Sequence, residues 1–258
     1  MTSLFINFLI ITVNSAVDNN FDQSQNCNRS DSLCYNGPKY DKNKQYKTCS
    51  SNGIVLSFDN APSIYTSKIL DVLKENRIKA IFFLKGSNII QYPDLVQRMI
   101  NEGHQIGSQT FDLSIITEIT SNKFEENIIA FENALSTVNI NHNFKKYFRA
   151  PRGYLPEDLL PIIEKYNYIP IQWTFRSGDV FAISVDDIIN TLKFHLEGTT
   201  VNNKKLSLII QFDSENTITG QYLNQVVNYL NTLCTKGTRF ITLNQCVTKK
   251  INRRLLVI

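Results

Sequence analysis

The chain has 258 residues, of which 42% are hydrophobic and 19% are charged, which suits one large α/β domain with a full core. Its formal net charge is +4, and four basic residues near the C-terminus, Lys249, Lys250, Arg253 and Arg254, account for that excess. The rest of the chain is balanced in charge, which argues against a nucleic-acid-binding protein, because such proteins carry a basic face.

The N-terminus contains an apolar run from Leu4 to Val13 that is followed by small residues. This run is too short to span a bilayer and fits the apolar part of a secretory signal, so we predict a secreted or extracellular protein. The alternative is a buried first strand or helix, because no Lys or Arg precedes the run. The predicted parts of the chain are a signal peptide (1–16), a polar arm (17–48), the main domain (49–247) and a basic tail (248–258).

Short β-prone runs alternate with amphipathic runs from Gly53 onward. Strands are predicted over 53–59, 79–86, 105–110, 146–151, 168–175, 206–213 and 239–243. Helices are predicted over 63–78, 121–138, 156–167, 184–196 and 220–237, with Ser121 as a cap and Gly237 as a C-terminal stop.

This alternation predicts a parallel sheet, and the nearly continuous apolar strands indicate that both of its faces are covered. An open doubly wound sheet and a closed or deformed barrel both fit the pattern. In either fold the functional site lies at the carboxyl ends of the strands, which selects Asp59, Gln109, Arg149, Arg176 and Asp213. The chain has neither a G-x-G-x-x-G after its first strand nor a P-loop, which disfavours nucleotide binding.

The strand ends read SFDNAP, GHQIGSQTFDL, FRAPRG, WTFRSGDV and IIQFDS in chain order. Together with AIFFLKGSNI and the closing FITLNQC, these motifs resemble the polysaccharide deacetylase family, the NodB-homology chitin and peptidoglycan deacetylases of carbohydrate esterase family 4. The resemblance covers residues 49–247. It implies a deformed (β/α) barrel of about seven parallel strands and zinc-assisted hydrolysis of an acetamide.

The first two motifs of that family supply a base and three metal ligands. The resemblance places the base at Asp59, while the metal positions read Asn60, Gln109 and Leu113. A carboxamide oxygen is a poor zinc ligand, and a leucine side chain has no donor atom.

The remaining motifs supply a group that orients the base, residues that line the pocket and a proton donor. The resemblance makes Arg149 the orienting partner of Asp59 and puts Phe212 at the position of the acidic histidine. Arg176 stands where the family has an aspartate that tunes that histidine. The other predicted pocket residues are Arg152, Trp173, Asp179 and Asp213.

These departures predict a pseudoenzyme, with no metal or other cofactor and with Asp59 and Arg149 as a vestigial pair. The predicted function is a non-catalytic, wall-associated protein that binds chitin or another polysaccharide. The alternatives are a residual or repurposed hydrolase of N-acetyl bonds and a protein-interaction module on the same fold. Arginines at the mouth of the barrel (Arg149, Arg152 and Arg176) would favour an anion or a glycan, and they disfavour a hard-metal site built from Asp59, Asp112, Asp179 and Asp213.

The five cysteines lack the paired spacing of a structural zinc site. The family resemblance implies a disulfide between Cys49 and Cys246, which flank the strand series. Cys27 and Cys34 are expected to pair locally, which would leave Cys234 free. The basic tail is either solvated or in contact with an acidic partner or a membrane surface.

Overall fold

The computed structural model describes residues 46–49, 51–138, 145–200, 206–234 and 238–247. The predicted signal peptide, Cys27, Cys34, Gly237 and the basic tail lie outside these residues. The predicted domain boundaries stay predictions. Within the described residues, no helix is long and apolar enough to cross a membrane.

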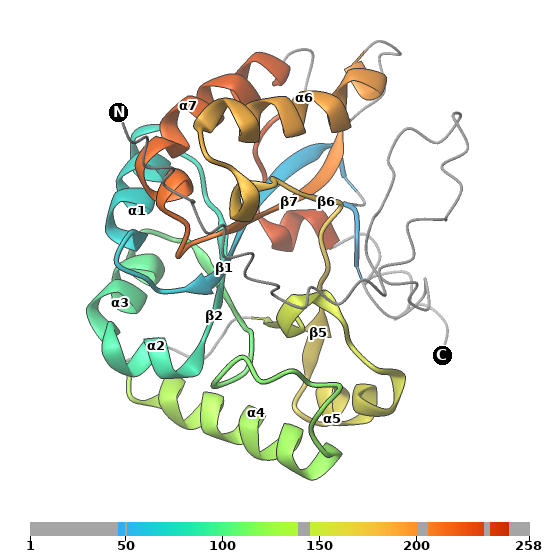
Figure 1. Cartoon of the computed structure of the whole chain (residues 1–258). Helices are drawn as coiled ribbons and strands as arrows, with labels where there is room; N and C mark the ends of the chain where they lie inside the picture. The colour runs from blue at the N-terminus through green and yellow to red at the C-terminus, as the bar shows by residue number, and fades with distance from the viewer. Residues whose placement is uncertain (1–45, 50, 139–144, 201–205, 235–237, 248–258) are drawn as a thin grey trace, which may run out of the picture. The chain divides into compact units, whose positions relative to one another are not determined.

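A sheet of seven strands, paired in parallel, forms the centre of the fold, in the order β5-β4-β3-β2-β1-β7-β6. It curls into a half-barrel, and Figure 1 shows the helices around its outside. The predicted deformed barrel of parallel strands is therefore confirmed. The strands are β1 (Gly53–Ala61), β2 (Ile81–Leu84), β3 (Gln105–Ser108), β4 (Lys146–Phe148), β5 (Tyr168–Pro170), β6 (Phe175–Arg176) and β7 (Ser207–Asp213).

Two of the predicted strands were wrong in detail. The run 168–175 is not one strand, because β5 pairs with β4 at one edge of the sheet and β6 pairs with β7 at the other. Residues 171–174 carry the chain between those edges across the open side of the half-barrel. The run 239–243 forms only an isolated bridge, between Phe240 and Ile54.

Helices cover the outer face of the sheet because their apolar stripes pack against alternate strand residues. The cap of α4 is Thr120, whose side chain accepts from the Lys123 N–H, and not Ser121 as predicted. Each of the five predicted helical runs contains an α-helix, whereas α2 and α3 were not predicted. The α-helices are α1 (Thr66–Glu75), α2 (Gly86–Gln91), α3 (Pro93–Asn101), α4 (Ser121–Ser136), α5 (Leu160–Lys165), α6 (Val185–Thr200) and α7 (Thr217–Leu233). Short 3-10 turns are η1 (Pro151–Gly153), η2 (Glu157–Leu159) and η3 (Asp179–Phe181).

Strand alternation divides the core into two faces. Phe58, Phe82 and Phe212 belong to the cluster beneath the helices, while Val55 and Ile209 belong to the cluster inside the half-barrel. Since successive side chains point to opposite faces, the side chain of Asp59 turns toward the inside of the half-barrel. The predicted disulfide between Cys49 and Cys246 is present and closes this inner cluster.

Candidate functional site

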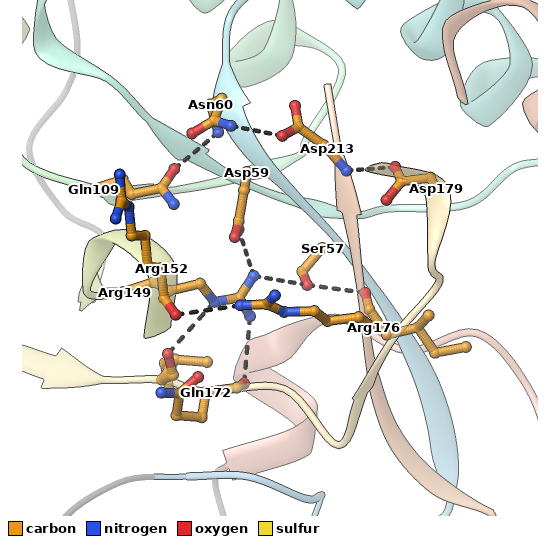
Figure 2. A network of polar contacts seen from close by, with 12 residues as sticks. Ser57, Asp59, Asn60, Gln109, Arg149, Arg152, Gln172, Arg176, Asp179 and Asp213 are labelled. Carbon is orange, nitrogen blue, oxygen red and sulfur yellow. Dashed lines mark hydrogen bonds and ion pairs between the residues drawn. The ribbon is translucent and has the colours of Figure 1, made fainter. Parts of the chain in front are cut away.

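A buried ion pair occupies the carboxyl ends of the strands. Arg149 Nη1 donates to Asp59 Oδ1 at 2.6 Å, and the two residues are 0% and 6% exposed. Figure 2 shows the carboxyl group of Asp59 turned toward the guanidinium. Burial raises the pKa of Asp59, and the charge of Arg149 opposes that rise. The carboxyl group is ionised in this pair, because a neutral Asp59 would leave Arg149 buried without a counter-charge.

Arg149 is fixed by further contacts on every side. Its Nη1 also donates to Ser57 Oγ at 3.0 Å, and its Nη2 donates to the Gln172 carbonyl at 3.3 Å. The guanidinium carbon lies 3.9 Å from the centroid of the Phe83 ring, which adds a cation–π contact. The arginine therefore holds the carboxylate of Asp59 in one orientation, and its role as the orienting partner of a base stays a prediction.

Asn60 connects the ion pair to the next strand end. Its backbone turns into the left-handed region at φ 58°, and its N–H donates to Gln109 Oε1 at 2.8 Å. Its Nδ2 donates to Asp213 Oδ2 at 2.7 Å, so Asn60 binds Gln109 through its backbone and Asp213 through its side chain (Figure 2). Asp213 stands opposite Asp59 in the register between β1 and β7.

Two arginines lie at the surface beside this network. Arg176 is exposed, its guanidinium lies 4.6 Å from the centroid of the Trp173 ring, and its Nη2 donates to the Arg152 carbonyl at 3.2 Å. The positive charge of Arg176 also lowers the pKa of Asp59. Trp173 is only 4% exposed, so its ring is not an open stacking surface.

Asp179 anchors the turn that follows β6. Its Oδ2 accepts from the Asp213 N–H and from Thr219 Oγ1, each at 2.7 Å. Its carbonyl accepts from Asn216 Nδ2 at 2.8 Å. Burial raises the pKa of Asp179, which is 1% exposed.

Three of the predicted residues lie apart from this network. The Phe212 ring stacks on Phe58 at 5.6 Å between centroids, on the helix side of the sheet, and so points away from Asp59. Leu113 is half-buried with φ 61° in the turn after β3. Asp112 is exposed and bonded to Ser114 and Asn127, so it does not join the other carboxylates.

Sequence reasoning missed several members of the network. Ser57 carried a signal, because strand alternation places it on the same face as Asp59. Gln172, Asn216 and Thr219 reach the site through loops and a helix start, and their spacing in the sequence gives no such signal.

The residues at the predicted metal positions do not fit the zinc ligands of the resemblance. Gln109 Oε1 already accepts from the Asn60 N–H, and Asn60 Nδ2 faces a carboxylate. Within the part of the chain that the structure describes, no three His, Cys, Asp or Glu residues gather as a set able to hold a metal ion.

Comparisons with known proteins agree with the fold. The family model described as polysaccharide deacetylase matches residues 46–171. A peptidoglycan-N-acetylglucosamine deacetylase of Bacillus cereus is 31% identical over 195 residues, which cover 74% of this chain and 66% of that protein. Chitin deacetylase 2 of Saccharomyces cerevisiae is 31% identical over 65% of this chain and 51% of its own length. The chain thus spans about half to two thirds of the length of these relatives.

A solved structure extends the similarity to most of the fold. A peptidoglycan N-acetylglucosamine deacetylase, in complex with a naphthyl N-hydroxybenzamide, has a TM-score of 0.67 and 27% identity. The match covers 80% of this chain and 93% of that one.

These relatives correct two of the predictions. The prediction of a pseudoenzyme is wrong, because similar proteins in sequence and structure are named as deacetylases and point to an enzyme. The prediction that the protein has no cofactor is wrong as well, because it treated the substitutions at Asn60, Gln109 and Leu113 as proof that the zinc site of the family had been lost. Members of this family are metal-dependent, and nothing in the comparisons shows that the dependence has been lost.

Proposed function

Since the chain belongs to the polysaccharide deacetylase family, we propose that it hydrolyses the N-acetyl groups of a wall polysaccharide of the chitin or peptidoglycan type. The observation that carries this proposal is the ion pair of Asp59 and Arg149 at the carboxyl ends of the strands. An ionised carboxylate held in one orientation is suited to act as a general base.

The proposed reaction uses Asp59 as the group that moves a proton. The carboxylate accepts a proton from a water molecule, and the water oxygen forms a bond to the carbonyl carbon of the acetamide. The C–N bond then breaks, and the proton held on Asp59 passes to the nitrogen of the leaving amine. The immediate products are acetic acid and an amino sugar, and the transfer of a proton from the acid to the amine gives acetate and an ammonium group, so atoms and charges balance.

Arg149 and Arg176 set the electrostatics of this step. Arg149 keeps the carboxylate aligned, and the positive charge of Arg176 favours the ionised form of Asp59. A cation near the reacting carbonyl would also favour the negative charge that develops on its oxygen.

An extracellular location is part of the same proposal. The disulfide between Cys49 and Cys246 is typical of an oxidising compartment, and wall polysaccharides lie outside the cell. The signal peptide over 1–16 and the contact of the basic tail with an acidic partner or a membrane surface stay predictions.

The test is acetate release by the full chain from chitotetraose and from peptidoglycan fragments. The metal content of the purified protein is measured first, and the assay is repeated after supplying Zn²⁺, Co²⁺ or Mn²⁺. We expect release by the unmodified protein and a loss of at least about 100-fold in Asp59→Asn, because general-base catalysis contributes that much.

The matched control is Asp71→Asn, which removes an exposed carboxylate from helix α1 and is expected to leave the rate unchanged. Absence of acetate release with every metal and both substrates would overturn the proposal. Equal rates in Asp59→Asn and the unmodified protein would remove Asp59 from the reaction.

A further inference from the structure

Two exposed arginines at the mouth of the half-barrel have no acidic partner among the described residues. Arg152 follows β4 and Arg176 ends β6, so each comes from a strand end of the candidate site. The ion pairs of the described residues include neither of them, whereas Asp59 neutralises the buried Arg149. Because arginine keeps its proton in proteins, two positive charges are in excess beside Asp59.

The guanidinium of Arg176 is held in one place. Its carbon lies 4.6 Å from the centroid of the buried Trp173 ring, and its Nη2 donates to the Arg152 carbonyl at 3.2 Å. An arginine has five N–H donors, so most of those of Arg176 stay available to a ligand. A guanidinium that is already oriented loses little entropy when it binds one.

Arg152 stands on a well-defined turn. Its φ of 58° lies in the left-handed region, which is uncommon for a residue other than glycine. The next residue, Gly153, lies so close to the Trp173 ring that an added Cβ atom would overlap it, and its carbonyl accepts from Gln172 Nε2. The turn therefore fixes the backbone of Arg152, while its exposed side chain has no hydrogen bond within the described part of the chain.

The two arginines lie on one side of the group that the proposed reaction uses. The positive charge of Arg176 lowers the pKa of Asp59, and Figure 2 shows the Arg152 side chain pointing toward the Gln109 end of the network. Asp213 lies at the other end, where it accepts from the side chain of Asn60. The mouth is thus basic on one side and acidic on the other.

A carboxylate is the ligand that the basic side suits best. Guanidinium groups bind carboxylates through charge-assisted hydrogen bonds, often two at a time. Chitin is uncharged and its deacetylated product is cationic, so neither would gain from two nearby arginines. A peptidoglycan glycan chain without its stem peptides carries a lactyl carboxylate on every second sugar, which places a negative charge beside each N-acetylglucosamine.

We propose that Arg152 and Arg176 form a carboxylate-binding site that selects N-acetylated glycans with acidic sugars over neutral chitin. This inference rests on the proposed function for the kind of polymer, but the binding of a carboxylate needs no hydrolysis. Since both side chains are exposed, the selectivity is expected to weaken as salt screens their charges.

The test compares two ligands that differ only in charge. One is a peptide-free peptidoglycan tetrasaccharide, and the other is the same molecule with its carboxylates converted to methyl amides. Calorimetry with the full chain is expected to show about tenfold tighter binding of the carboxylate form in 0.05 M NaCl, the scale of a charge-assisted hydrogen bond, and a smaller difference in 0.5 M NaCl. Arg152→Gln and Arg176→Gln are each expected to remove most of this difference.

Arg77→Gln is the matched control. Arg77 is also exposed, has a φ of 56° and belongs to none of the ion pairs of the described residues. It stands in the turn between α1 and β2, at the opposite end of the strands, so its replacement is expected to leave the preference unchanged. Because all three arginines are exposed, the variants are expected to fold, which the midpoint of thermal unfolding checks.

The outcomes separate this inference from the proposed function, because acetate is assayed in the same samples. A preference for the carboxylate form that depends on both arginines supports the site, even where no acetate is released and the proposed function fails. Equal binding of the two forms by the unmodified protein, or binding of neither, overturns the site even where acetate is released. A preference that survives in Arg152→Gln or in Arg176→Gln also overturns it, as does one that is lost in Arg77→Gln.

Discussion

Asp213 has two carboxylate oxygens with different neighbours. Oδ1 accepts from the Glu215 N–H at 2.8 Å, and Oδ2 accepts from Asn60 Nδ2 at 2.7 Å. Burial raises the pKa of Asp213 to about 7; the Glu215 N–H opposes this rise, and the charges of Asp59, Asp179 and Glu215 add to it. This carboxyl group therefore changes its charge close to neutral pH.

This shift makes the free energy of unfolding depend on pH. The unfolded chain has an ordinary Asp pKa of 3.8, so between that pH and about 7 the folded state binds more protons. The contribution of Asp213 to stability is thus lost as the pH rises through this range. We expect the free energy of unfolding of Asp213→Asn to change less with pH than that of the unmodified protein, as measured by urea unfolding at pH 4.5, 5.5, 6.5 and 7.5.

Asp71→Asn is the control for losing an exposed carboxyl group, and its profile is expected to follow that of the unmodified protein. Asp59 and Asp179 also have raised pKa values. The free energy of unfolding of the unmodified protein and of both variants is therefore expected to keep some decline as the pH rises. Parallel profiles for Asp213→Asn and the unmodified protein would show that Asp213 is ionised throughout the range.

Residue positions at strand ends were predictable, but contacts made through loops were not. The rule that sites gather at the carboxyl ends of parallel strands selected Asp59, Arg149 and Asp213 from the sequence. To predict which face of the sheet the Phe212 side chain lies on, one needs the register of β7 against β1, and strand alternation alone does not fix that register. The bond from Asp179 to Thr219 joins a turn to a helix 40 residues away, so only the folded chain shows it.

At the scale of elements, Arg149 joins three parts of the sheet. It follows β4, it bonds to Ser57 and Asp59 in β1, and it reaches the carbonyls of Ile171 and Gln172 beyond β5. A side chain with this many buried contacts stabilises the curl of the sheet as well as the orientation of Asp59. Its removal would leave both a cavity and an uncompensated carboxylate.

Arg149→Met is therefore expected to lower the free energy of unfolding by about 3–5 kcal/mol, the typical cost of breaking a buried ion pair from one side. Urea unfolding at neutral pH measures this change. The double variant Arg149→Met with Asp59→Asn removes the unpaired charge and is expected to recover part of the loss. A double variant no more stable than Arg149→Met would show that packing, and not charge, dominates at this position.

The strands themselves were predictable where the apolar run was long and bounded by turn residues. The runs 53–59 and 206–213 correspond to β1 and β7, which pair along seven residues of register. The run 168–175 misled the prediction because its apolar character is shared by two edge strands and the segment that connects them. The local hydrophobic pattern of a sequence indicates which residues are buried, but it does not indicate which neighbouring strand a strand pairs with.

For the whole molecule, residues 46–49, where the predicted polar arm meets the main domain, close the open side of the half-barrel. Tyr46 forms a parallel bridge with Ile171, and the Cys49 N–H donates to the Ser207 carbonyl at 3.4 Å. The disulfide from Cys49 to Cys246 then joins two points separated by 197 residues. One bond thus restrains nearly the entire sequence of the domain.

Loss of this bond is expected to have a large effect on the unfolded state. In the chain-entropy model, a loop of this length contributes about 5 kcal/mol, because the cross-link removes conformations that the unfolded chain would otherwise sample. The double variant Cys49→Ser with Cys246→Ser is expected to lose that amount in urea unfolding under oxidising conditions. Reductant should bring the unmodified protein to the same stability and should leave the double variant unchanged.

Cys234→Ser tests whether that effect belongs to this pair of cysteines. Cys234 is a free, half-buried thiol at the end of α7, so its replacement is expected to leave both the stability and the response to reductant unchanged. A response to reductant that disappears in Cys234→Ser would assign the stabilising cross-link to a different pair. The closure of the half-barrel would then depend on the backbone contacts of Tyr46 and Cys49, which reductant does not alter.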